Sequence, residues 1–146
     1  MRTFTLIAAA ALVTAAGLTH AADIEGLRFI DDFSIATGTQ FDGTNVGGLS
    51  GIDFDPATGR YWAISDDRSG FNPARFYNLN VNFDLNSINS VNFNSRTNIL
   101  RPDGTNFPTN QVDPEAIRFD PATNSLHLSL IHISEPTRLR RISYAV

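Results

Sequence analysis

Residues 47–69 read GGLSGIDFDPATGRYWAISDDRS and contain the clearest structural signal of the chain. Residues 52–54 alternate apolar and polar side chains as a β-strand does, and residues 60–64 form a second run of β-favouring side chains. Between them, residues 55–59 combine an Asp that can bond the turn backbone, a Pro with a fixed φ and a Gly suited to a left-handed conformation. The stretch predicts a hairpin whose second strand ends in three charges, at residues 66–68.

The glycines at residues 47–51 have two possible uses. A phosphate-cradling loop would need a Lys followed by Ser or Thr and a helix after it, and this run has neither. We therefore expect the glycines to allow close backbone packing near a propeller axis, or a β-bulge.

The same hairpin is repeated later in the chain. Residues 117–124, IRFDPATN, match residues 52–59, IDFDPATG, in their apolar and turn positions, with Asn in place of the final Gly. Asn is the next most tolerant residue of a left-handed backbone. The repeat predicts radially arranged β units, with propeller blades as the leading candidate, while the alternative is a common turn used twice.

The remaining segments also favour strands. Residues 27–30 and 31–35 predict a first strand or two, residues 76–83 alternate apolar residues with Asn, and residues 84–97 predict another strand flanked by turns. Residues 101–108 form a loop by their Pro and Gly content. No segment has helical periodicity, so the predicted class is all-β, an N-terminal fragment of a β-propeller of about two blades.

Residues 1–21 predict a cleaved signal peptide. Arg2 precedes an apolar run, residues 4–17, and small residues surround a cleavage point at Ala21. The alternative, a membrane anchor, would need about 20 apolar residues. We expect an exported protein, periplasmic or extracellular, that is not inserted stably in a membrane after cleavage.

Residues 128–146 suggest an origin different from that of the rest of the chain. Residues 128–138 and 142–146 resemble the translated read-through of an indexed sequencing adapter, with residues 139–141 where the variable index would fall. We therefore predict an artefactual tail at 128–146 and a truncated domain at 22–127. The alternative, a genuine basic tail, would make its three arginines an anion or membrane patch.

Composition restricts the class of function. Residues 22–127 contain 7 Arg, no Lys and 14 acidic residues, a net charge of −7, and the chain has no cysteine. Nucleic-acid binding requires a basic surface, so we expect none. Disulfide stabilisation is excluded, whereas many oxygen ligands suit a hard cation such as calcium.

Two acidic clusters stand at predicted strand ends. Asp66 and Asp67 precede Arg68, while Asp113 and Glu115 precede the second repeat. Carboxylates on loops at strand ends can serve as metal ligands or as general acids and bases, and Arg68 and Arg75 can bind phosphate oxygens. The alternative is that these carboxylates cap turns and pair with the arginines.

Four blocks of the sequence together resemble the phytase-like family, described as an esterase-like activity of phytase. They are residues 47–55, 62–69, 74–77 and 113–118, in the family's order. The resemblance implies an exported bacterial β-propeller, longer than this chain, with a phosphoesterase activity on small phosphorylated substrates such as inositol phosphates.

The resemblance also implies roles for the clustered residues. Asp67, Asp113 and Glu115 would hold calcium, and Asp66, Arg68 and Arg75 would be catalytic, with the arginines orienting the phosphoryl oxygens. No serine lies in a Gly-x-Ser-x-Gly elbow, which disfavours an acyl-esterase triad. The alternative function is a non-catalytic propeller that binds calcium and a ligand, and the 146-residue chain itself is expected to be inactive.

Overall fold

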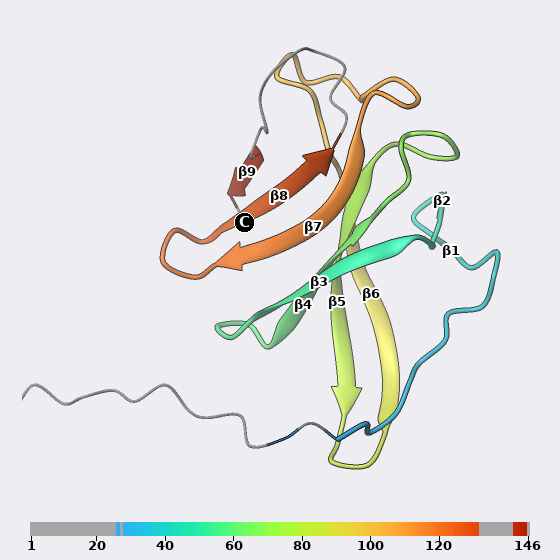
Figure 1. The fold of residues 1–146 in the computed structure, drawn as a ribbon, viewed down its shortest axis with the longest axis vertical. Helices are drawn as coiled ribbons and strands as arrows, with labels where there is room; N and C mark the ends of the chain where they lie inside the picture. Colours follow the sequence, from blue (N-terminus) through green and yellow to red (C-terminus); the bar gives the residue numbers. More distant parts are fainter. Residues whose placement is uncertain (1–25, 27, 132–141, 146) are drawn as a thin grey trace, which may run out of the picture.

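A computed structural model describes residues 26, 28–131 and 142–145, and side chains as far as residue 131. The described chain forms three antiparallel sheets (Figure 1). Their orders are β1-β2, β3-β4-β5-β6 and β7-β8-β9. The strands are β1 (Gln40–Phe41), β2 (Thr44–Asn45), β3 (Leu49–Asp55), β4 (Arg60–Ser65), β5 (Arg75–Phe83), β6 (Ile88–Asn98), β7 (Asp113–Asp120), β8 (Ser125–Ile131) and β9 (Ile142–Ala145).

The repeated hairpin is confirmed as β3-β4 and β7-β8. Gly59 and Asn124 occupy equivalent turn positions with φ of 69° and 50°. Asp55 accepts hydrogen bonds from the Ala57 amide at 2.9 Å and from the Thr58 hydroxyl. Asp120 repeats these bonds with the Ala122 amide at 2.9 Å and the Thr123 hydroxyl at 2.8 Å. The two turns are therefore built alike because the sequence repeats their side chains.

A second feature is repeated at the other end of these hairpins. The register of β3 with β4 shifts between Leu49 and Gly51, and that of β7 with β8 shifts between Pro114 and Ala116. The skipped residues, Ser50 and Glu115, occupy equivalent places in the two repeats. Each strand thus carries a bulge, and the bulge predicted from the glycines at 47–51 is confirmed.

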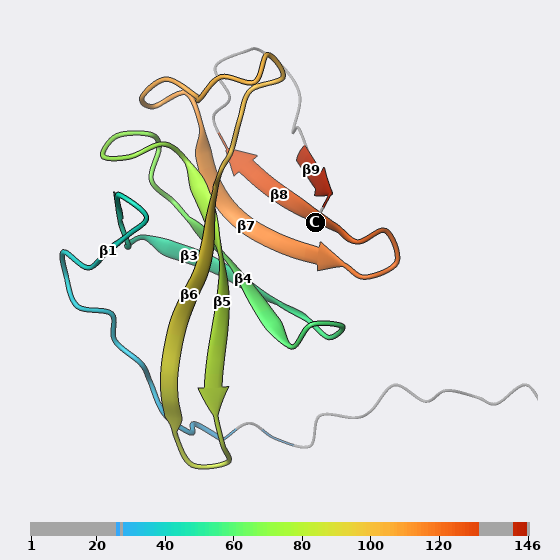
Figure 2. The same cartoon turned by 180° about the vertical axis from the view of Figure 1, so that it is seen from behind.

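The glycines also permit the close packing that was predicted. A Cβ atom placed on Gly51 would lie 3.2 Å from the Ala116 Cα and 3.3 Å from the Ile117 amide nitrogen. Strands β3 and β7 therefore lie side by side, as both views show (Figures 1 and 2). The Asp53 carboxylate accepts a hydrogen bond from the Phe119 amide at 2.7 Å across the same junction.

The main core lies between the four-stranded sheet and β7-β8. It gathers buried side chains from both repeats and from the connection before β7. Its members are Trp62, Ile64, Ala74, Phe76, Ile99, Phe107, Val112, Ile117, Phe119, Leu126, Leu128 and Leu130. A smaller cluster of Ala63, Tyr77 and Leu79 lies on the opposite face of the four-stranded sheet. This sheet therefore buries side chains on both faces, as a propeller blade does.

The opposite face is only partly covered. A groove of about 390 Å³ runs across it, with Leu49, Ile52 and Val91 in its walls. Phe33 and Ile35, from the segment before β1, also line the groove. Ile52 remains 52% exposed, so this face retains accessible apolar surface.

The strand prediction for residues 27–35 is wrong where the structure describes it. Residues 28–35 belong to no strand. They lie along the β5-β6 hairpin through side chains, since Arg28 donates to the Leu85 carbonyl at 2.5 Å and Asp31 accepts from the Ile88 amide at 3.0 Å. Strand-like composition did not produce a strand here because no backbone ladder forms with a neighbour.

The fold is all-β and forms a partial, propeller-like fragment in which one complete sheet and a second hairpin unit pack together. The described residues form no helix, so none of them makes up a helix able to cross a membrane. The predicted signal peptide at 1–21 lies outside the described residues, as do 132–141 of the predicted tail. The predicted boundary after residue 127 falls inside β8, where Leu128 and Leu130 are buried, and the origin of the tail stays a prediction.

Candidate functional site at the β4-β5 loop and the start of β7

The predicted site residues lie where two loops meet. The β4-β5 loop carries Asp66, Asp67 and Arg68, and the β6-β7 connection leads into β7. The Asn110 amide donates to the Arg68 carbonyl at 2.8 Å, and the Thr109 hydroxyl donates to the Ser69 carbonyl at 2.9 Å. These bonds hold the two loops together at the end of the molecule opposite the repeated turns (Figure 1).

Arg68 is the centre of a charged cluster. Its guanidinium donates to the Asp113 carboxylate, and its side chain is 48% exposed whereas that of Asp113 is 9% exposed. The hydrogen bond and charge of Asp113 raise the pKa of Arg68, and the negative charges of Glu115 and Asp66 raise it further. Carboxylates from the end of β4 and from β7 therefore act on one guanidinium.

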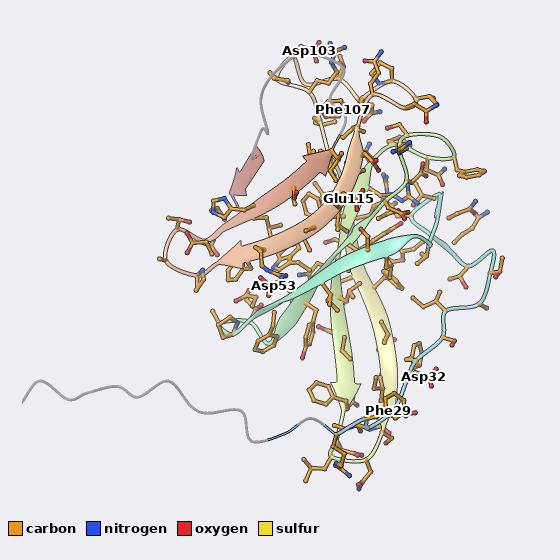
Figure 3. All side chains as sticks on the ribbon, in the orientation of Figure 1. Phe29, Asp32, Asp53, Asp103, Phe107 and Glu115 are labelled. Carbon is orange, nitrogen blue, oxygen red and sulfur yellow. The ribbon has the colours of Figure 1, made fainter. Side chains whose placement is uncertain are left out.

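The β7 bulge places Glu115 in this cluster. Pro114 and Ala116 pair with consecutive residues of β8, so Glu115 is the extra residue of the strand. Figure 3 shows Glu115 near the loop end of β7, whereas Asp53 lies towards the turn end of β3. The sequence shows that Glu115 precedes the second repeated hairpin. The direction of its side chain depends on the bulge, which forms only when β7 pairs with β8.

Asp66 is positioned from the other side of the cluster. Its amide donates to the Gly48 carbonyl at 2.7 Å, and a Cβ atom on Gly48 would lie 1.9 Å from the Asp66 Oδ1. Gly48 has a φ of 59°. The Asp66 side chain therefore occupies space that only glycine leaves open.

Asp67 and Arg75 form a separate pair beneath the loop. Arg75 Nη1 lies 2.9 Å from Asp67 Oδ2, and the Arg75 side chain is 2% exposed. Asp67 also accepts hydrogen bonds from the amides of Gly70, Phe71 and Asn72. Burial acts to raise the pKa of Asp67, but Arg75 and the three amides outweigh it, and the pKa is lowered.

The structure thus divides the predicted site into two groups. The half-exposed Arg68 pairs with the buried Asp113 and is acted on by the charges of Glu115 and Asp66, while Asp67 pairs with the buried Arg75. The catalytic and metal-binding roles assigned to these six residues stay predictions. Sequence reasoning missed Tyr77, whose hydroxyl accepts a hydrogen bond from Arg75 Nε at 2.6 Å. The sequence contains one signal for this contact: Arg75 and Tyr77 are two residues apart, and residues at this spacing in a strand share a face.

The predicted calcium ligands were tested against this geometry. Among the residues that the structure describes, no three Asp, Glu or His side chains are grouped so that they could hold a metal ion. Asp67 has both oxygens engaged by Arg75 and backbone amides, and Asp113 is paired with Arg68. Asp67, Asp113 and Glu115 therefore do not form a calcium site in this arrangement, and calcium binding stays a prediction.

The fold and the charged cluster define an all-β, propeller-like protein with a polar site at the β4-β5 loop and the start of β7. Comparison with protein families gives the particular group: the phytase-like family model, described as esterase-like activity of phytase, matches residues 44–130. This match covers more than half of the chain, and the chain belongs to the phytase-like family. A search of curated proteins found no match, and a search of solved structures also found none.

Proposed function

We propose that this chain is part of an exported phosphate monoester hydrolase that acts on small phosphorylated substrates such as inositol phosphates. The observation that carries the proposal is the position of Arg68. Its half-exposed guanidinium is held by Asp113, and the negative charges of Glu115 and Asp66 also act on it. A planar guanidinium with free edges can bind two phosphate oxygens and stabilise charge that develops during phosphoryl transfer.

The two neighbouring carboxylates supply acid and base chemistry. A water molecule attacks phosphorus, a new P–O bond forms and the ester P–O bond breaks. One carboxylate accepts the proton of the water while an acid group gives a proton to the departing alcohol oxygen. Glu115 lies on β7 and Asp66 lies in the β4-β5 loop, and the charges of both act on Arg68, so they are our candidates for these roles.

The charge of the cluster supports a cation requirement. The charges of three carboxylates act on one guanidinium, so a doubly charged phosphate meets a net negative site. A divalent ion would offset this repulsion. Calcium is the predicted cofactor, and we assign it no set of ligands among the described residues.

The test is phosphate release from inositol hexakisphosphate by the full-length protein, with calcium and with a calcium chelator. We expect turnover that depends on calcium and falls by about 100-fold in Arg68→Met, the scale of losing one transition-state donor. Arg60→Met is the matched control, because it removes an equal charge at the exposed β3-β4 turn. Absence of turnover from the wild-type protein would reject the hydrolase, and calcium binding without turnover would favour the non-catalytic binding protein.

A further inference from the structure

Arg75 is almost completely buried, yet its guanidinium is well satisfied. Nε donates to the Tyr77 hydroxyl at 2.6 Å, and Nη2 donates to the Asn45 carbonyl at 2.7 Å. Nη1 donates to Asp67 at 2.9 Å and to the Pro73 carbonyl at 3.1 Å. Four of the roughly five N–H donors of a guanidinium are therefore used within the protein.

The partners of Arg75 hold the shape of the β4-β5 loop. Asp67 Oδ1 accepts from the Gly70 amide at 2.8 Å, and Oδ2 accepts from the Asn72 amide at 2.9 Å. The Asn72 side chain in turn accepts from the Asn45 amide at 3.0 Å. Arg75 and Asn45 thus connect the loop to β5 and β2, with Asp67 as the central acceptor.

This network is joined to the proposed reaction site through the chain. Asp66 and Arg68 flank Asp67 in the chain, so the backbone held by Asp67 also sets where their side chains begin. Arg68 must reach Asp113 on the other sheet, and its pairing depends on that backbone position. The exposure of the two arginines differs accordingly, at 48% for Arg68 and 2% for Arg75.

We propose that Arg75 is a positioning residue that acts through Asp67, and that Arg68 alone of the two arginines contacts phosphate. The inference rests on the proposed function for its catalytic consequence. Its structural part is independent: Arg75 fixes the loop conformation that presents Asp66 and Arg68. The N–H groups of this guanidinium already donate to Asp67, Tyr77 and Asn45, so few donors are available for a substrate.

The experiment uses the full-length protein with Arg75→Met, Asp67→Asn and the double variant. Amide hydrogen exchange at residues 70–72 should become about tenfold faster in each single variant, because a charge-assisted hydrogen bond is lost. kcat/KM for phosphate release should fall by about 10-fold to 100-fold in each, the effect of a small misplacement of catalytic groups. kcat/KM of the double variant should be no lower than that of the less active single variant, since both changes break the same contact between Arg75 and Asp67.

Arg96→Met is the control, because it removes an arginine whose carboxylate partner, Asp42, is largely exposed. We expect it to leave exchange at residues 70–72 unchanged. Effects of Arg75→Met and Asp67→Asn that multiply in the double variant would show that Arg75 binds substrate directly and would overturn the proposal. Should Arg75→Met fail to fold, Arg75→Lys replaces it, because it keeps the charge but loses the fork that joins Asp67 to Tyr77 and Asn45, and unchanged exchange at residues 70–72 overturns the proposal.

A wild-type protein without turnover would reject the proposed function but not this inference. Amide hydrogen exchange at residues 70–72 would then be the only test of whether Arg75 positions the β4-β5 loop. Faster exchange in both single variants would support loop positioning, and unchanged exchange would contradict it.

Discussion

Arg68 and Arg75 show how burial separates two residues that the sequence treats alike. Arg68 lies in the β4-β5 loop and Arg75 begins β5, and both were predicted to orient phosphate. The structure leaves Arg68 half exposed in an ion pair with Asp113, and it surrounds Arg75 with protein acceptors. Availability to a ligand is therefore decided by what packs around each guanidinium.

Asp67 should give the protein a specific dependence on pH. Its pKa in the folded state is lowered from an ordinary value of 3.8. The ionised form is therefore favoured by folding, and its contribution is complete well above pH 3.8 and is lost as pH falls through the folded pKa. We expect Asp67→Asn to lower the free energy of unfolding by about 1–3 kcal/mol at pH 7.

Urea unfolding of the full-length protein at several pH values checks this prediction. The difference between wild type and Asp67→Asn should be constant near neutrality and should shrink below pH 3.8. Asp66→Asn is the matched control, because it removes the adjacent carboxylate without breaking the bonds to Arg75 and the loop amides. A difference that did not change between neutral and acidic pH would contradict the assignment.

At the scale of elements, the repeated turn depends on one backbone conformation. Gly59 and Asn124 both have positive φ, which costs an ordinary L-residue about 1–2 kcal/mol. We expect Gly59→Ala to lower the free energy of unfolding by about that amount. Gly59→Asn should cost less, because Asn occupies the equivalent position in β7-β8. Thermal unfolding of Gly59→Ala and Gly59→Asn measures which variant loses more stability. Equal losses of stability would contradict the equivalence of the two turns.

The junction between β3 and β7 depends on a missing side chain. A Cβ atom on Gly51 would meet the Ala116 Cα at 3.2 Å and the Ile64 Cγ2 at 3.3 Å. Two of its three close neighbours are backbone atoms of β7, which cannot move without shifting the strand. We expect Gly51→Ala to destabilise the protein by about 1–3 kcal/mol, as overpacking does.

Gly47→Ala is the control for this prediction. A Cβ atom on Gly47 would meet nothing within 4 Å, and the residue lies in the same glycine-rich run. Denaturant unfolding should show a much smaller loss for Gly47→Ala than for Gly51→Ala. Equal losses would mean that chain stiffness, and not the contact between strands, explains the effect.

At the scale of the whole molecule, the apolar face of the four-stranded sheet limits independent folding. Ile52 is 52% exposed and Phe54 is 43% exposed beside a groove of about 390 Å³. Exposed apolar surface of this kind promotes association. We therefore expect residues 22–127, produced alone, to have low solubility, and a sharp, reversible thermal transition would contradict this expectation.

A longer fragment provides the comparison. Ending the chain after residue 127 removes Leu128 and Leu130, which are 1% and 3% exposed in the core. Residues 22–131 should therefore yield more soluble protein and bind less of a hydrophobic dye than residues 22–127. Identical behaviour of the two fragments would show that these leucines do not contribute to a folded core.

The local structure was largely predictable. The repeated turns formed as expected, because Asp55 and Asp120 bond their own turns and because Gly59 and Asn124 tolerate a left-handed backbone. These interactions join neighbours in the chain, so the sequence contains all of their determinants. The segment at 28–35 was predicted wrongly because a strand requires a partner, which composition does not supply.

By itself, the sequence determined the β class, the repeated hairpins and the set of charged residues at the loop end. Only the tertiary structure decided how those charges are used. The guanidinium of Arg75 was buried in a pair with Asp67, whereas the half-exposed Arg68 pairs with the buried Asp113 and is acted on by the charges of Asp66 and Glu115. The physical reason is that turns depend on contacts between near neighbours, whereas burial and pairing depend on strands that the chain brings together from distant positions.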